Sequence, residues 1–176
     1  MESVLISINP KWCDLIVLGK KTIEVRKTRP KMGTPFKCYI YCTKDRHNAL
    51  VVRNGQAKKI ICDNSDTAIY CGGCPGNGKV IGEFVCDEIL VIAGHKFYDD
   101  VGRFIYDRIQ DACLTEKEID DYLDGKYGYG WHISNLVIYD KPMELSEFQH
   151  CGANYHYNPT VSQPPQSWFY AEEVRK

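Results

Sequence analysis

Short segments in which hydrophobic and polar residues alternate recur along most of this sequence, and they limit what the chain can fold into. Alternation with a period of two places every second side chain on one face, as in a half-buried β-strand. The pattern predicts strands at residues 4–8, 21–28, 36–43, 79–92, 131–139 and 168–171. Five or six short strands with few helices favour an α+β fold built as a small mixed β-barrel.

Helix boundary signals follow the first predicted strand and return late in the chain. Asn9 suits an N-cap, Pro10 suits the first helical position, and Gly19 suits the end of an early helix. Residues 99–125 predict a helical insertion. Its second helix begins with a capping box formed by Thr115 and Glu118.

One stretch lacks any regular pattern. Residues 45–78 are polar and end in CGGCPGNG, a run of turn-forming residues, so we expect an irregular insertion there. With 44% hydrophobic residues, the 176-residue chain can form a sizeable core. We therefore expect one domain over residues 1–176.

Charge is distributed unevenly along the chain. Residues 1–60 carry 13 basic and 4 acidic side chains, whereas residues 61–176 carry 9 basic and 19 acidic ones. Nine basic side chains against two acidic ones fall within residues 20–46, and nine acidic ones against three basic ones fall within residues 99–124. This pattern predicts a local basic surface that suits a small anionic ligand or a short single strand better than a long duplex.

The cysteines and the start of the chain bear on the cellular compartment. Nine cysteines, an odd number, indicate reduced thiols more than a disulfide framework. Cys71 and Cys74 form one C-x-x-C pair, which is a weak signal for zinc because a structural site needs four ligands, so we expect no metal site. The opening residues, MESVLISINPKW, have no basic n-region or long apolar run, which favours the cytoplasm and no membrane association.

Four charged or polar residues of the strand at residues 21–28 are the main candidates for chemistry. Glu24 and Arg26 fall on one face, and Thr22 extends that row. Lys21 is out of phase with Glu24, so both reach one pocket only if the corner before the strand turns Lys21 inward. The alternative is that these charges form a solvated row of ion pairs.

The run Gly19-Lys20-Lys21-Thr22-Ile23-Glu24-Val25-Arg26 resembles the G-x-K-x-x-E-x-R signature of the ASCH family. The segments YIYCTK, GKVIGEFV and YGWHISNL resemble later strands of phage and bacterial members. The resemblance implies a PUA-like β-barrel with a ligand cleft between the first helix and the barrel. It also implies RNA binding, hydrolysis of N4-acylated cytidines or ribonuclease activity as candidate functions.

Within that resemblance, the amide-hydrolase branch uses a Lys as base and a Thr three residues later as nucleophile. Lys21 keeps the first position, but Glu24 stands at the second. A carboxylate supports different chemistry from an activated hydroxyl, and Thr22 is at the wrong spacing to replace it.

Aromatic and polar residues can complete a nucleotide site, because bases stack on aromatic rings. The candidate ligand contacts are Lys21, Thr22, Glu24, Arg26, Trp12, Tyr41, Tyr129, Trp131 and Ser134. There is no Walker-type loop, dinucleotide-binding glycine motif or G-x-S-x-G elbow, so no such cofactor is expected.

Three hypotheses follow from the sequence. The first is binding of RNA, a short single strand, a nucleotide or a modified base in a basic cleft. The second is a hydrolase for an acylated nucleoside or RNA, with Lys21 and Glu24 as the working pair. The third is a protein-interaction module that uses the acidic helical insertion.

Overall fold

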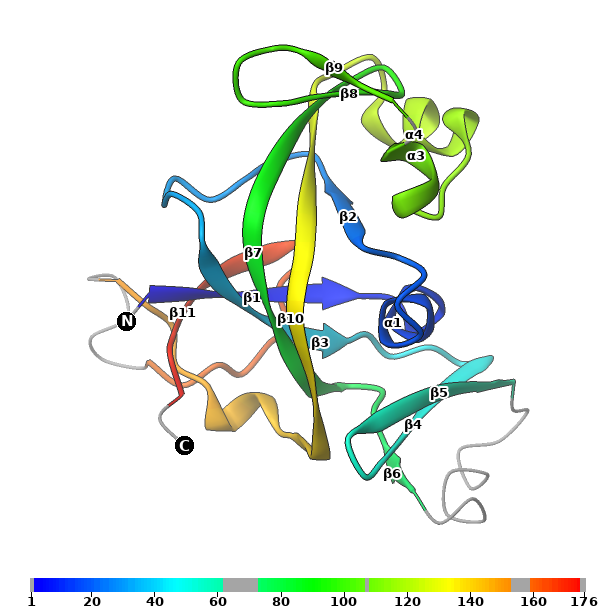
Figure 1. Ribbon diagram of the computed structural model, residues 1–176. Helices are drawn as coiled ribbons and strands as arrows, with labels where there is room; N and C mark the ends of the chain where they lie inside the picture. Colours follow the sequence, from blue (N-terminus) through cyan, green and yellow to red (C-terminus); the bar gives the residue numbers. More distant parts are fainter. Residues whose placement is uncertain (1, 62–72, 107, 153–158, 175–176) are drawn as a thin grey trace. The chain divides into compact units, whose positions relative to one another are not determined.

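The fold is a strand-rich α+β arrangement, seen in a computed structural model that describes residues 2–61, 73–106, 108–152 and 159–174 (Figure 1). The first half contains β1 (Glu2–Ile8), α1 (Pro10–Val17), β2 (Ile23–Arg26), β3 (Phe36–Cys42), β4 (Asn48–Arg53), β5 (Gln56–Ile61) and β6 (Cys74–Pro75). The second half contains β7 (Lys79–Ala93), β8 (Lys96–Tyr98), β9 (Phe104–Ile105), α3 (Arg108–Asp111), α4 (Glu116–Leu123), β10 (Gly128–Met143), the 3₁₀ helix η1 (Leu145–Glu147) and β11 (Trp168–Glu172).

These residues form two compact units, each assembled from separate stretches of chain. The first unit comprises Met1–Val17, Lys37–Phe84 and Leu136–Lys176. The second comprises Leu18–Phe36 and Val85–Asn135. The two longest strands, β7 and β10, each have residues in both units. A single folding domain over the whole chain stays a prediction.

The first unit contains the mixed sheet that the sequence predicts. Its strands are ordered β11-β1-β3-β7-β10, with β1 parallel to β3 and antiparallel to β11. Tyr39, Tyr41, Tyr139 and Phe148 pack in one core cluster of this unit. Closure of the sheet into a PUA-like barrel stays a prediction.

The early helix forms as its boundary signals predict. The Asn9 carbonyl accepts bonds from the backbone of Trp12 and Cys13, and its side-chain Oδ1 accepts one from the backbone of Lys11 at 3.0 Å. These contacts satisfy N–H groups that the first helical turn leaves open. Gly19, just beyond α1, has a φ of +67°, which glycine adopts without strain.

Regular strands occupy part of the stretch that the sequence led us to expect to be irregular. β4 and β5 pair as an antiparallel hairpin through residues 48–61, joined by Asn54 and Gly55, and β6 pairs with β4. The hairpin is tied to α1 because the backbone N–H of Lys59 donates to Asp14 Oδ1 at 2.6 Å. The prediction of an irregular insertion is therefore wrong for these strands, while residues 62–72 lie outside the described part of the chain.

The helical insertion contains less helix than the sequence predicts. Residues 104–105 form β9, which pairs with β8, and α3 is only four residues long. The prediction of a helical insertion over residues 99–125 is therefore wrong for its first part, because residues 104–105 pair as a strand and Gly102 lies at a φ of +81°. The Thr115–Glu118 capping box of α4 is confirmed.

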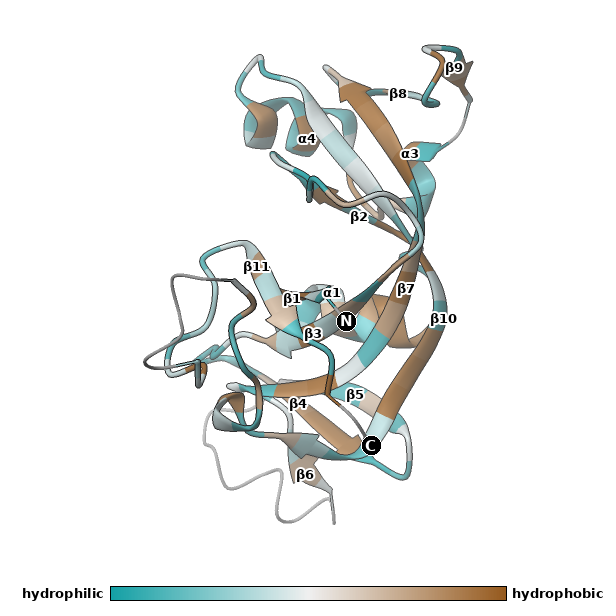
Figure 2. Cartoon of the chain, turned by 90° about the vertical axis from the view of Figure 1, so that its left-hand side faces the viewer, coloured by the Kyte–Doolittle hydropathy of each residue, from teal (hydrophilic) through white to brown (hydrophobic). Residues whose placement is uncertain are grey.

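The core of the second unit lies between β2, β7, β8 and the two helices. Its buried residues are Ile23, Val25, Leu90, Ile92, Phe97, Ala112, Ile119 and Leu123. Figure 2 shows hydrophobic and hydrophilic residues together on α4, and this helix buries Ile119 and Leu123. The apolar face of β2 is thus packed, which leaves its other face for charged side chains.

Candidate functional site

Three charged side chains, from just before β2 to its last residue, meet in one cluster. Glu24 Oε1 lies 3.0 Å from Nη2 of Arg26, and Glu24 Oε2 lies 3.4 Å from Nζ of Lys21. Lys21 precedes the strand, and its Nζ also donates to the backbone carbonyl of Ala112 at 2.7 Å. The corner therefore turns Lys21 inward, as a shared pocket requires. We call Lys21, Glu24 and Arg26 the charged cluster.

The charged cluster is buried, so it is not a solvated row of ion pairs. The exposed fractions of Lys21, Glu24 and Arg26 are 2%, 6% and 7%. Desolvating three charges is expensive unless their geometry is well satisfied, so such clusters in small domains need a specific structural or functional reason. Backbone hydrogen bonds also fix the chain between Lys21 and β2. The Thr22 N–H donates to the Asp111 carbonyl, and the Thr22 carbonyl accepts from the Ile133 N–H.

β10 runs antiparallel to β2 and places aromatic residues opposite the charged cluster. Tyr129 is the ladder partner of Arg26, and Trp131 is the partner of Glu24. Opposed residues of an antiparallel pair project from the same face. Tyr129 is half-buried, and the guanidinium of Arg29 lies 5.5 Å from its ring centroid.

Trp131 does not offer an open stacking surface. Its side chain is fully buried and packs edge-on against Phe36, with ring centroids 5.7 Å apart. The prediction that this ring stacks on a base is therefore not supported by its position. As the ladder partner of Glu24, this buried ring is an apolar neighbour of the charged cluster.

Tyr122 of α4 is a residue near the charged cluster that was not among the candidate ligand contacts. Its ring is 40% exposed, and Nζ of Lys27 lies 5.0 Å from its centroid. Burial raises the pKa of the Tyr122 phenol, and the charges of Arg26 and Glu24 act on that pKa in opposite directions. The hydroxyl is thus within electrostatic reach of both residues. The sequence around Tyr122 gives no signal for this, because an aromatic residue at helical spacing is usually part of the core.

Ser134 and His132 of β10 bond to β7. Ser134 Oγ donates to the Val85 carbonyl at 2.9 Å, and His132 Nδ1 lies 2.6 Å from Asp87 Oδ1. Burial raises the pKa of Asp87, but hydrogen bonds from His132 and Ser134 outweigh this and lower it. Both polar side chains are therefore occupied in joining two strands, which makes Ser134 a weaker ligand candidate than the sequence suggests.

Two predicted contacts, Trp12 and Tyr41, belong to the first unit. Trp12 is half-buried on α1, with Nζ of Lys11 4.2 Å from its ring centroid. Tyr41 is buried in the core cluster of the first unit, where burial raises the pKa of its phenol. The assignment of Tyr41 to a ligand surface is therefore not supported, because both faces of β3 are covered and alternation alone does not show this.

The described part of the chain has few of the side-chain groupings that bind metals. No group of three or more His, Cys, Asp or Glu side chains there is arranged to hold a metal ion. Cys71 lies outside the described residues, so the proposed partner of Cys74 is not placed. The cysteines that the structure describes are all free thiols: Cys13, Cys38, Cys42, Cys74, Cys86, Cys113 and Cys151.

No helix in the described ranges has the length and apolar character to cross a membrane.

A mixed sheet with an early helix places this chain in the strand-rich α+β class. Within that class, its fold is similar to that of an ASCH protein of known structure. The crystal structure of ASCH from Zymomonas mobilis matches with a TM-score of 0.57 and 20% sequence identity, over 99% of this chain and 88% of that one. The resemblance to ASCH in the Gly19–Arg26 run is thus confirmed at the level of the fold.

Crystal structures of two variants of the Zymomonas mobilis protein match in the same way. One has a tyrosine replaced by phenylalanine, with a TM-score of 0.58, 20% identity and coverage of 99% of this chain and 91% of that one. The other has a serine replaced by alanine, with a TM-score of 0.57, 19% identity and coverage of 99% and 89%. No protein-family model matches the chain, and no curated protein matches it.

Proposed function

We propose that this protein binds RNA as a short single strand, or a nucleotide or modified base derived from it, through the charged cluster. The observation that carries the proposal is the geometry of Glu24, which holds Lys21 at 3.4 Å and Arg26 at 3.0 Å. Lys21 and Arg26 are 2% and 7% exposed, so a ligand must open this corner before its phosphate or carbonyl oxygens can bind the two cations. The three side chains together carry one net positive charge, which suits an anionic ligand.

Glu24 supplies the complementary acceptor. Its Oε2 atom is buried and accepts no hydrogen bond from the described residues, since the contact with Lys21 is an ion pair. A buried carboxylate oxygen with unused acceptor capacity is costly in the free protein. An amino or hydroxyl donor on a base or ribose would satisfy it, which gives the site a means of selecting among anionic ligands.

The surrounding surface supports a nucleic acid more than a simple anion. The stretch Leu18–Phe36 carries six basic side chains and one acidic one. Lys27 and Arg29 are exposed and lie over the rings of Tyr122 and Tyr129. Cations interleaved with aromatic rings are typical of single-strand sites, where rings stack on bases and cations contact phosphates. A closed PUA-like barrel is an expectation of the family resemblance, and the proposal does not depend on it.

Binding of a fluorescein-labelled, mixed-sequence RNA decamer, followed by anisotropy, tests the proposal. We expect binding that weakens steeply between about 50 and about 200 mM salt. Lys21→Met and Arg26→Met should each weaken it about tenfold or more. Lys117→Met is the matched control, because Lys117 is an exposed lysine of α4 paired with Asp121. Unchanged binding in both cluster variants that remain folded, or no salt-dependent binding by the unaltered protein, would contradict the proposal.

A hydrolase is the second candidate, favoured by the 3.4 Å contact between Lys21 and Glu24. In this alternative the carboxylate, in place of a threonine hydroxyl, attacks the substrate or activates water. However, Lys21 donates to the Ala112 carbonyl, which suits a positioned cation better than a base. Turnover of N4-acetylcytidine or RNA that is lost in both Lys21→Ala and Glu24→Gln, with the fold intact, would support the enzyme; no turnover by the unaltered protein would exclude it for these substrates.

A further inference from the structure

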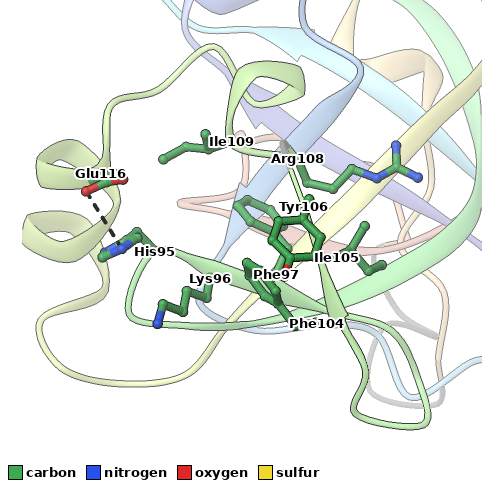
Figure 3. A pocket seen from close by; sticks show the side chains of 9 residues that line it. All are labelled: His95, Lys96, Phe97, Phe104, Ile105, Tyr106, Arg108, Ile109 and Glu116. Atoms are coloured by element: carbon green, nitrogen blue, oxygen red, sulfur yellow. Dashed lines mark ion pairs between the residues drawn. The ribbon is translucent and has the colours of Figure 1, made fainter.

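A separate cavity of about 220 Å³ lies in the second unit, among β8, β9, α3 and the beginning of α4. Figure 3 shows an aromatic side across from His95 and Glu116. The lining residues are His95, Lys96, Phe97, Phe104, Ile105, Tyr106, Arg108, Ile109 and Glu116. None of them belongs to the charged cluster. The cavity is therefore distinct from the proposed nucleotide site.

The floor of the cavity is apolar and its rim is unusually exposed. Phe97 is buried, and Ile105 and Ile109 pack against the same core. In contrast, Phe104 and Tyr106 are 43% and 78% exposed, and their rings meet edge-on with centroids 4.6 Å apart. Exposed aromatic residues grouped beside a cavity are characteristic of interaction surfaces rather than of ordinary protein surface.

The size of the cavity indicates which kind of occupant it fits. Sites for cofactors and drug-sized ligands usually have volumes of roughly 300–1,000 Å³. A cavity of about 220 Å³ is smaller, and it suits one apolar side chain of a partner. Burying a single anchor of this kind in a pocket is how a few residues supply most of the affinity of a protein interface.

The charged residues beside the cavity indicate which residues of the partner would lie next to its anchoring side chain. Glu116 forms the wall with His95, whose Nε2 lies 3.7 Å from Glu116 and whose Nδ1 lies 3.2 Å from Asp120. Further along α4, Asp121 and Asp124 are exposed. Lys96 and Arg108 also line the cavity, and Arg108 is paired with Asp111 at 3.1 Å, so the acidic excess belongs to the exposed face of α4. A partner with basic residues would match this face and be steered towards it.

We propose that this cavity, with the exposed face of α4, docks a basic segment of another protein that inserts one apolar or aromatic side chain next to lysine or arginine. The anchor fills the space between Phe97, Phe104 and Ile109, while its basic neighbours lie along Glu116 and Asp120. The acidic insertion and the charged cluster then serve different partners. The proposal does not depend on nucleotide binding.

The test is selection of a phage-displayed library of random heptapeptides on the full-length protein, with counter-selection on the Phe104→Ser variant. We expect enrichment of peptides with a large apolar residue within two positions of lysine or arginine. The most enriched peptide is then made with a fluorescent label. It should bind the Phe104→Ser variant at least about tenfold more weakly than the unaltered protein. It should bind the Glu116→Lys variant at least about fivefold more weakly. Tyr127→Ser and Glu172→Lys, which change an exposed tyrosine and an exposed glutamate outside the cavity, should bind it as the unaltered protein does.

Several results would overturn the proposal. One is no enrichment over the counter-selection, and another is enrichment of peptides that are acidic or lack an apolar residue. A third is self-association in sedimentation velocity that Phe104→Ser abolishes, because the cavity would then hold a second copy of this chain. Binding of the RNA decamer should be unchanged in Phe104→Ser. Loss of peptide binding and loss of RNA binding are therefore distinguishable.

Discussion

Glu24 and Trp131 are direct ladder partners in the antiparallel pair of β2 and β10, so a carboxylate that holds two cations lies on the same face as a fully buried indole. The pairing matters because a low-dielectric neighbour strengthens the ion pairs of Glu24. Because the surroundings are buried, replacing the Glu24 carboxylate with a neutral group would leave two buried cations without a counter-charge. The first prediction follows from this arrangement.

Glu24→Gln should destabilise the protein by about 3–5 kcal/mol, because it leaves Lys21 and Arg26 buried without their shared counter-charge. Urea unfolding monitored by circular dichroism measures the change in the free energy of unfolding. Asp121→Asn breaks the exposed Lys117 pair on α4 and should cost no more than about 1 kcal/mol. Equal losses in the two variants would show that the burial of the charged cluster has no energetic consequence.

Gly82→Ala should destabilise the first unit by about 1–3 kcal/mol or more. A Cβ at this position of β7 would lie 2.3 Å from the Val137 carbonyl oxygen of β10, and a backbone atom cannot move aside cheaply. The measurement is the shift of the urea midpoint. Gly33→Ala serves as control, because its Cβ would meet nothing within 4 Å, and it should unfold like the unaltered protein.

Cys86 should resist alkylation in the folded protein. Burial raises the pKa of its thiol to about 12, with a further contribution from the Asp87 charge, so almost none is thiolate at pH 8. Mass spectrometry after iodoacetamide treatment should show modification of the partly exposed Cys113 before Cys86. Rapid labelling of Cys86 without unfolding would contradict its burial, whereas labelling in about 8 M urea is expected.

The Asp87–His132 contact should make stability fall in acid. The pKa of Asp87 is lowered from its ordinary 3.8, so its stabilising contribution is fully present above that value and is lost as pH falls through the lower folded-state pKa. Because the pair is partly exposed, we expect a contribution of at most about 1 kcal/mol. The difference in unfolding free energy between the unaltered protein and Asp87→Asn should shrink between about pH 5 and pH 2; a difference that grows would contradict this assignment.

Sequence patterns predicted the features whose stabilising contacts join residues close together in the sequence. The Asn9 cap, the Thr115–Glu118 box and the pairing of Glu24 with Arg26 all involve residues within four positions of each other. One local signal was overlooked. Asn54-Gly55 between two β-forming runs is the typical sequence of a two-residue hairpin, and both residues have positive φ values of 51° and 70°.

The remaining features depend on partners far away in the sequence. Lys21 turns inward towards the carbonyl of Ala112, 91 residues later, and no pattern around Lys21 specifies that contact. The strand pairing of Phe104 with Tyr98 likewise replaces helix in the first part of the insertion predicted for residues 99–125. The burial of Tyr41 and Trp131 was not predictable, because alternation distinguishes two faces of a strand but does not show that both are covered.

The division of each unit into separate stretches of chain has a consequence for synthesis on the ribosome. The first unit contains β1, yet it lacks β11 and the end of β10 until residues after Asn135 have been made. The second unit has all of its residues once Asn135 has emerged. The unit that starts later is therefore the first whose sequence is complete, and the nascent β1 must wait for its β11 partner.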